Sequence, residues 1–112
     1  MGIDSVRELE RRILKDFIDL AILSLLYHDD SKVGGYDVIK YLHRRFGFLI
    51  SAGRVYSHLY MLEREGLLRG WHDGRKRVYA LTRKGKDTTK MIVNARDRIG
   101  KFVSSILTKF KG

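Results

Sequence analysis

The segment SAGRVYSHLYMLEREGLL (residues 51–68), followed by RGWHDGRKRVYALTRKG (residues 69–85), decides how this chain folds. From Val55, apolar residues recur at i, i+4 and i+7, which predicts a helix with one buried face. Ser51 can cap the N-terminus of this helix, and Gly66 can end it. The segment therefore predicts a well-defined helix that leads directly into the residues after Gly66.

Those residues predict a two-stranded hairpin over about 67–72 and 77–81. An Asp73-Gly74 pair between runs of β-favouring residues is a strong turn signal. Arg75, Lys76 and Arg77 follow the turn. A helix followed by a basic hairpin is typical of a winged helix-turn-helix, in which one element enters the major groove of DNA and the wing lies on the backbone. We expect a mainly α fold with a small β-hairpin wing.

Positive charge is concentrated where this helix and hairpin lie. The chain has 23 Lys and Arg against 13 Asp and Glu, a net charge of +10. Residues 1–39 carry 5 basic and 8 acidic side chains, residues 40–86 carry 12 and 3, and residues 87–112 carry 6 and 2. A clustered basic face indicates a polyanion partner, here double-stranded DNA. A solvated surface is the alternative. A membrane is disfavoured, because there is no basic amphipathic tail or lipidation motif.

Other helices are expected before this segment. We predict a helix over 5–27, a polar loop over 28–32, a helix over 36–45 and an apolar connector over 46–50 that packs under the next helix rather than forming a strand. Ser5 can cap the first helix, whose apolar positions widen from Phe17 onward, as for a helix buried on several sides. Gly34-Gly35 opens the second helix.

A final helix is predicted from Thr82, which can cap it, to about Phe110. Its apolar residues alternate at spacings of three and four through Ile99 and Ile106, as in a coiled-coil seam. A helix of that length spans about 37 Å, which is more than a small core needs. We therefore expect a homodimer held by this helix. Packing on the first helix within one chain is the alternative.

Length and residue types exclude several classes of function. A chain of 112 residues, 44% of them hydrophobic, forms one domain. Residues 1–86 are the expected DNA-binding part, and residues 87–112 continue it as a dimerisation helix. There is no cysteine, and the histidines lack ligand spacing, so we predict no metal, cofactor or enzymatic site. A charged N-terminus and short apolar stretches indicate a cytoplasmic protein.

Four short motifs occur in the order and spacing of a known family. They are GYDVI at 35–39, SAGRVY at 51–56, LEREGL at 62–67 and RVYALTRKG at 77–85. In these motifs the chain resembles the PadR family of winged-helix transcriptional regulators, over about residues 23–86. The resemblance implies a C-terminal dimerisation helix, and phosphate contacts from Ser51 and Tyr56. Ala52 stands where the family has proline, a mild change because alanine suits a first helical turn. Arg54 stands where the family has threonine, at a position facing DNA, so the family's operator preference does not carry over.

The candidate DNA-binding residues lie on a recognition helix over about 52–65 and on a wing over about 72–78. They are Ser51, Arg54, Tyr56, Ser57, His58, Arg64, Arg75, Lys76 and Arg77. Arg54 lies in the first helical turn, where base edges are usually reached, and can pair with guanine through two hydrogen bonds. A phosphate contact is the alternative for Arg54. The three wing cations are expected to contact phosphate. His58 can instead be a solvated surface residue, and Tyr56 can sit at the edge of the core.

Three functions are compatible with these patterns. The first is a dimeric, sequence-specific transcriptional regulator, and the second is a small architectural protein that coats DNA with little specificity. The third is a winged-helix adaptor that binds proteins, which the basic centre disfavours. The ratio of specific to nonspecific affinity separates the first two. No residue pattern points to a particular small-molecule effector.

Overall fold

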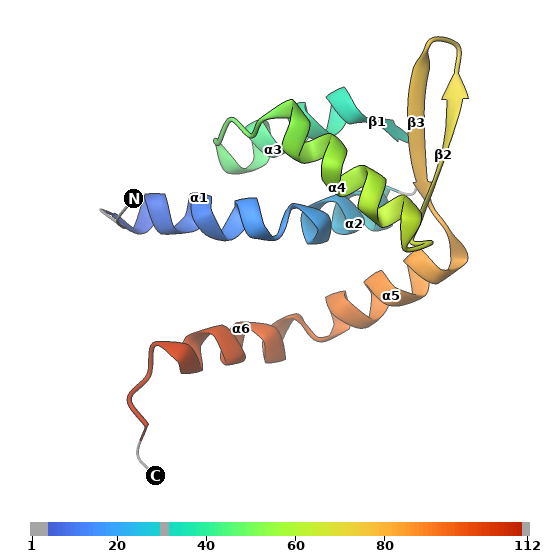
Figure 1. The fold of residues 1–112 in the computed structure, drawn as a ribbon. Helices are drawn as coiled ribbons and strands as arrows, with labels where there is room; N and C mark the ends of the chain where they lie inside the picture. The colour runs from blue at the N-terminus through green and yellow to red at the C-terminus, as the bar shows by residue number, and fades with distance from the viewer. Residues whose placement is uncertain (1–4, 30–31, 111–112) are drawn as a thin grey trace.

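The computed structural model describes residues 5–29 and 32–110 as helices around a small sheet. The elements are α1 (Val6–Asp16), α2 (Ile18–Asp29), β1 (Val33–Gly34), α3 (Gly35–Phe46), α4 (Ala52–Arg64), β2 (Leu68–Asp73), β3 (Lys76–Leu81), α5 (Arg83–Asn94) and α6 (Arg96–Ile106). Figure 1 shows this order along the chain. The predicted fold class is confirmed: α4 takes the place of the recognition helix, and the β2–β3 hairpin forms the wing.

The core is built around α2, which packs against α4, α5 and β3. Ile18 and Ile22 of α2 are fully enclosed. The apolar face of α4 that the spacing predicts, from Val55 to Leu62, is buried against it. Because α2 is apolar on nearly all sides, its burial on several faces at once follows from its sequence.

The single helix predicted over residues 5–27 is wrong in one respect, because it is broken at Phe17. Ser5 caps α1 as predicted, accepting a hydrogen bond from the Glu8 N–H at 3.1 Å. At Phe17 the backbone leaves helical geometry, with φ −120° and ψ 29°, and its N–H reaches both the Ile13 and Leu14 carbonyls. The break gives the two halves different surroundings: α1 reaches the connector after α3, while α2 enters the core.

The loop predicted over residues 28–32 is also shorter than expected. His28 and Asp29 belong to the last turn of α2, while Asp30 and Ser31 lie outside the described residues. Lys32 follows, and β1 begins directly after it.

Within the described residues the sheet is antiparallel with strand order β1-β3-β2. The two-residue strand β1 was not predicted, because its pairing of Val33 with Tyr79 joins residues far apart in sequence. In the hairpin Asp73 pairs with Lys76, so Gly74 and Arg75 form the turn, one residue later than predicted. Gly74 has φ +67°, which glycine adopts without strain. The hairpin projects at the end of the molecule opposite the start of α1 and the end of α6 (Figure 1).

The segment between α3 and α4 packs as an apolar connector without forming a strand, as predicted. Phe48 and Ile50 are buried, while Leu49 points to solvent. The Arg7 guanidinium of α1 lies 3.9 Å from the centre of the Phe48 ring and donates to the Phe46 carbonyl at 3.2 Å. This contact fixes α1 against the connector that leads into α4.

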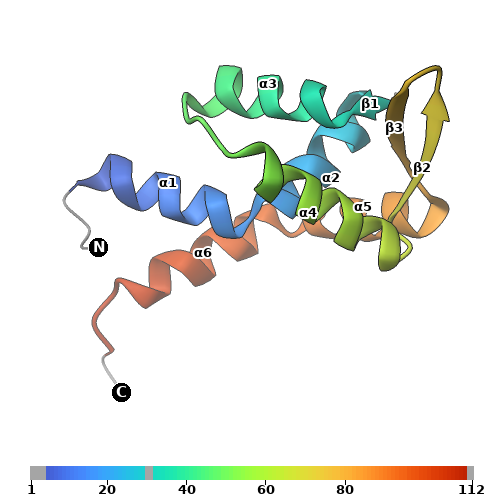
Figure 2. The same cartoon turned by 45° about the horizontal axis from the view of Figure 1, so that its top comes forward.

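The single C-terminal helix predicted up to Phe110 is likewise wrong, because it breaks at Ala95 and ends at Ile106. Thr82 does cap α5, accepting from the Gly85 N–H at 3.0 Å. Asn94, whose side chain competes for backbone hydrogen bonds, directly precedes the break. None of the residues of α6 is buried, so no packing holds the two halves in line. Both α1 and α6 extend from the core toward the end opposite the wing (Figures 1 and 2).

Gly85 is where α5 passes closest to the end of the α4 segment, and it generates a stability prediction. A Cβ at this position would overlap with the backbone carbonyl of Leu67, which cannot rotate away. Gly85→Ala should lower the free energy of unfolding by about 1–3 kcal/mol, the typical cost of overpacking a well-packed site. Gly53, in the first turn of α4, faces open space. Gly53→Ala should therefore raise stability by about 0.5–1 kcal/mol. Urea unfolding of both variants checks this, and a Gly85→Ala variant as stable as the parent contradicts it.

Candidate nucleic-acid interface

The outer face of α4 presents polar and basic side chains opposite its buried face. Ser51 caps the helix, accepting a hydrogen bond from the Arg54 N–H at 3.3 Å. Arg54, Ser57 and Arg64 are exposed, as predicted from their spacing. The remaining first-turn amides have no partner within the helix, so this end is positively polarised. The face therefore offers donors and cations on a rigid, capped scaffold.

Tyr60 belongs to the same outer face but was missed from the sequence. Its side chain is 56% exposed, and the Arg64 guanidinium lies 5.6 Å from the centre of its ring. A helical projection carries the signal that could have found it, because Tyr60 lies three residues after Ser57 and four before Arg64. An exposed aromatic ring with a cation over it can contact an apolar base edge or the sugar-phosphate backbone.

Two other predicted site residues lie on the flanks of α4 rather than at its centre. His58 is half-buried on one flank. On the other, the Tyr56 ring lies so close to Gly35 that any Cβ there would overlap with it. Tyr56 thus joins α4 to the start of α3, which explains in physical terms why glycine precedes Tyr36. With 47% of its surface exposed, Tyr56 still reaches solvent beside the wing side of the helix.

The wing cations differ in their partners. The Arg77 guanidinium donates to Glu63 of α4 at 2.7 Å, and the hydrogen bond raises the pKa of Arg77. The Lys76 ammonium lies 3.1 Å from the Asp37 carboxylate of α3. Arg75, in the turn, has no ion-pair partner within residues 5–29 and 32–110. Two of the three predicted cations therefore tie the wing to the helices, and one stands free at its tip.

The hairpin is also held to the segment that precedes β1. Lys32 forms an ion pair with Asp73 at 2.6 Å, and this hydrogen bond lowers the pKa of the Asp73 carboxyl. Contacts from α3, α4 and the segment before β1 thus fix the direction in which the wing projects.

Trp71 is half-buried on the hairpin, with the Arg69 guanidinium 4.9 Å from its ring centre.

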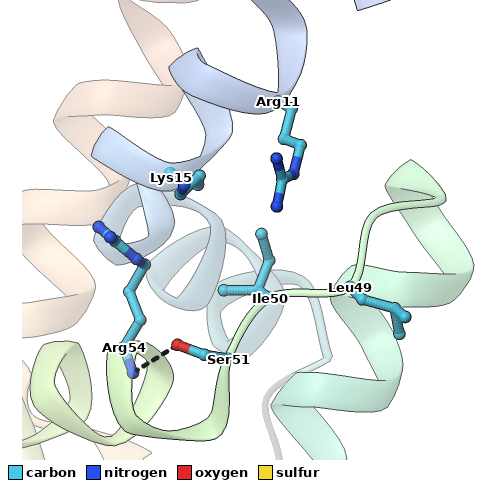
Figure 3. Close-up of a pocket in the computed structure, with 6 residues that line it drawn as sticks. All are labelled: Arg11, Lys15, Leu49, Ile50, Ser51 and Arg54. Carbon is cyan, nitrogen blue, oxygen red and sulfur yellow. Dashed lines mark hydrogen bonds between the residues drawn. The ribbon is translucent and has the colours of Figure 1, made fainter. Parts of the chain in front are cut away.

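Arg54 has a more specific orientation than its exposure alone suggests. Its guanidinium extends toward α1, where Arg11 and Lys15 lie on the opposite side of a shared hollow (Figure 3). The hollow has a volume of about 340 Å³ and is also lined by Leu49, Ile50 and Ser51. Arg54 therefore lies at the edge of the outer face of α4, between that face and α1.

The described residues contain no group of three or more His, Cys, Asp or Glu side chains placed to hold a metal ion. In the same residues, none of the helices combines the length and hydropathy needed to cross a bilayer.

Residues 22–91 match the family model described as the transcriptional regulator PadR-like family. Among solved structures, a PadR family transcriptional regulator from Eggerthella lenta is 22% identical, with a TM-score of 0.74 over 94% of each chain. A PadR family transcription regulator from Clostridium difficile is 24% identical, with a TM-score of 0.70 over 82% of this chain and 99% of that one. A transcriptional regulator from Clostridium thermocellum is 20% identical, with a TM-score of 0.72 over 87% of this chain and 96% of that one. None of the curated proteins matches the chain.

The contacts of Asp37 predict how the stability of the wing attachment depends on pH. The Gly34 N–H, at 2.9 Å, and then Lys76 lower the pKa of the Asp37 carboxyl. Because the folded-state pKa lies below the unfolded value of about 4, Asp37 stabilises the fold above that pH and loses this effect as pH falls through the folded-state pKa. With 37% of the side chain exposed, solvent screening keeps the effect small.

Asp37→Asn should lower the free energy of unfolding by about 0.5–1 kcal/mol at pH 7, and by less near pH 3. Denaturant unfolding of parent and variant at the two pH values checks this. Asp16→Asn, at the exposed end of α1, is the control and should leave stability unchanged at both. A gap for Asp37→Asn that is equal at pH 7 and pH 3 would contradict the role of the carboxylate charge.

Proposed function

Because the chain belongs to the PadR-like family of transcriptional regulators, we propose that it is a homodimeric, sequence-specific DNA-binding regulator acting in the cytoplasm. The observation that carries the proposal is a capped helix, α4, whose polar outer face lies beside a hairpin that ion pairs hold in place. In this arrangement α4 enters the major groove and the wing lies along the adjacent backbone.

The outer face of α4 supplies groups for both kinds of DNA contact. Ser57 and Arg64 can hydrogen-bond to base edges, and Tyr60 and Met61 can contact the thymine methyl group. Ser51 and Tyr56 lie at the edges of this face, where they can donate to phosphates. His58, half-buried on one flank of α4, completes the set that we assign to DNA. The orientation of Arg54 toward α1 favours a phosphate contact over base readout.

Of the three predicted wing cations, Arg75 alone has no ion-pair partner within the described residues. Lys76 and Arg77 have carboxylate partners in Asp37 and Glu63, so we assign them mainly to holding the wing against α3 and α4. Arg75 is exposed at the tip and is assigned to a DNA phosphate. A braced hairpin delivers this cation to a fixed place, which reduces the entropy lost on binding.

The dimer is proposed from an apolar surface that one chain leaves uncovered. Along α6, Ile99, Phe102, Val103 and Ile106 are all exposed, and along α1 so are Val6, Ile13 and Phe17. Exposed apolar side chains that recur on one side of a helix mark an interaction surface. A second copy is the simplest occupant, and its recognition helix would lie about 34 Å away, one DNA turn along a near-palindromic site.

Two other functions fit the fold less well. An architectural protein needs cations but not a face of hydrogen-bonding groups presented by a capped helix. An adaptor does not need 12 basic against 3 acidic residues over positions 40–86. Members of the family are transcriptional regulators rather than enzymes.

The assignment of Arg75 predicts a change in the salt dependence of DNA binding. Arg75→Ala should weaken binding to any duplex and reduce the magnitude of the slope of log K against log salt by about 0.9, because one phosphate contact is lost. Lys101→Ala removes the same charge from the outer side of α6 and should leave the slope unchanged. Fluorescence anisotropy across a salt series measures both. An equal slope in the two variants would sink the assignment.

The apolar face predicts the oligomeric state. Ile99→Glu together with Ile106→Glu should give monomers in sedimentation velocity, because two carboxylates cannot be buried unpaired in an apolar seam. These side chains are 43% and 68% exposed within one chain, so the monomer should keep its helical circular dichroism. Lys101→Glu together with Ser104→Glu, on the opposite side of α6, should leave the dimer intact. A dimer that survives the isoleucine substitutions contradicts the proposal.

A further inference from the structure

Helix α1 has two different flanks on either side of the buried Leu14. Val6, Ile13 and Phe17 recur on one flank and form the exposed apolar face described above. Arg11 and Lys15 are four residues apart and lie together on the other flank. The basic flank is therefore separate from the surface assigned to the dimer.

The basic flank faces the N-terminus of α4 across the hollow shown in Figure 3. Arg11 and Lys15 reach into it from α1, and Arg54 reaches into it from α4. Ile50, which is buried, and Leu49 line it beside Ser51. We call this site the basic pocket. Three cationic side chains from two elements thus line one hollow beside the positively polarised end of a helix.

The three cations of the basic pocket have no acidic partner. None of them forms an ion pair within the described residues. By contrast, Lys32, Lys76 and Arg77 each pair with a carboxylate, and Lys84 donates to the Glu65 carbonyl at 2.9 Å. Arg11 and Lys15 are also half-buried, so they are partly desolvated as well as mutually repelling. The three cations that line the basic pocket are therefore available for an anion.

We propose that the basic pocket binds a phosphate group. A phosphate accepts several hydrogen bonds at once, which suits two guanidiniums, an ammonium and the amides at a helix N-terminus. A carboxylate would engage fewer of these donors. The pocket then places a phosphate at the N-terminus of the proposed recognition helix.

Two sources can supply that phosphate. The backbone of bound DNA passes the N-terminus of a helix in the major groove, so Arg11 and Lys15 would extend the protein–DNA contact to α1. This source rests on the proposed function. The other source is a free phosphate or phosphorylated small molecule, which a hollow of about 340 Å³ can accommodate.

The test compares Arg11→Ala with Arg12→Ala, an exposed neighbour on α1 that does not line the pocket. Inorganic phosphate is added to DNA-free protein at constant ionic strength while the amide resonances of Ala52 and Gly53 are followed by NMR. Separately, the salt slope of DNA binding is measured. Lys15→Ala serves as a second pocket variant, and Arg54→Lys keeps the charge without the planar guanidinium.

We expect phosphate to shift these resonances in the parent and in Arg12→Ala but not in Arg11→Ala. For DNA, Arg11→Ala should reduce the magnitude of the slope by about 0.9, while Arg12→Ala and Arg54→Lys keep the parent slope. Selective resonance shifts with equal slopes would identify a free phosphate as the ligand. A slope difference identifies the DNA backbone. If the protein binds no DNA, the proposed function is wrong, and the phosphate titration alone then tests whether the basic pocket binds phosphate. If the Arg11→Ala and Arg12→Ala variants behave identically in both measurements, the proposal that the basic pocket binds phosphate is wrong.

Discussion

The burial of α2 on several sides is the constraint on which the rest of the structure depends. Ile18 and Ile22 are fully enclosed, and α4, α5 and β3 all pack on this helix. Because the buried face of α4 is committed to α2, its outer face must point to solvent in a fixed direction. The same packing brings Gly85 of α5 against the Leu67 carbonyl, so the wing emerges at a set place between α4 and α5. The packing of the core thus fixes the orientation of the outer face of α4 and the position of the wing, which together form the candidate interface.

Carboxylates on the helices then determine which cations remain free. Asp37 and Glu63 pair with Lys76 and Arg77, which holds the start of β3, next to the turn of the wing, against α3 and α4. These pairs are partly exposed, so each contributes little to stability, and their main effect is on orientation. Four cations at the wing tip and beside the N-terminus of α4 form no ion pair within the described residues: Arg75, Arg11, Lys15 and Arg54.

Capping residues, helical periodicity and turn residues predicted the elements whose structure depends on contacts within a few residues. Ser51, the Val55 stripe and the Asp73-Gly74 pair specify a capped helix and a hairpin through contacts within a few residues. The strand β1 depends on pairing between distant segments, which no short pattern encodes, and no glycine or proline marks the break at Phe17. The break at Ala95 follows from missing packing beyond Asn94 rather than from any strong helix-breaking residue. The partners of Lys76 and Arg77, and the meeting of Arg11, Lys15 and Arg54, also required the tertiary structure, because each joins separate elements.

Selection of genomic fragments by the full chain at moderate salt, followed by sequencing, tests the central claim most directly. A dimer with two recognition helices should enrich a near-palindromic motif whose half-sites are centred about one helical turn, ~34 Å, apart. Bound fragments that share no motif would instead show architectural binding with little specificity. If the protein retains no DNA under these conditions, the claim that it is a DNA-binding regulator is wrong, and a protein-binding adaptor is favoured.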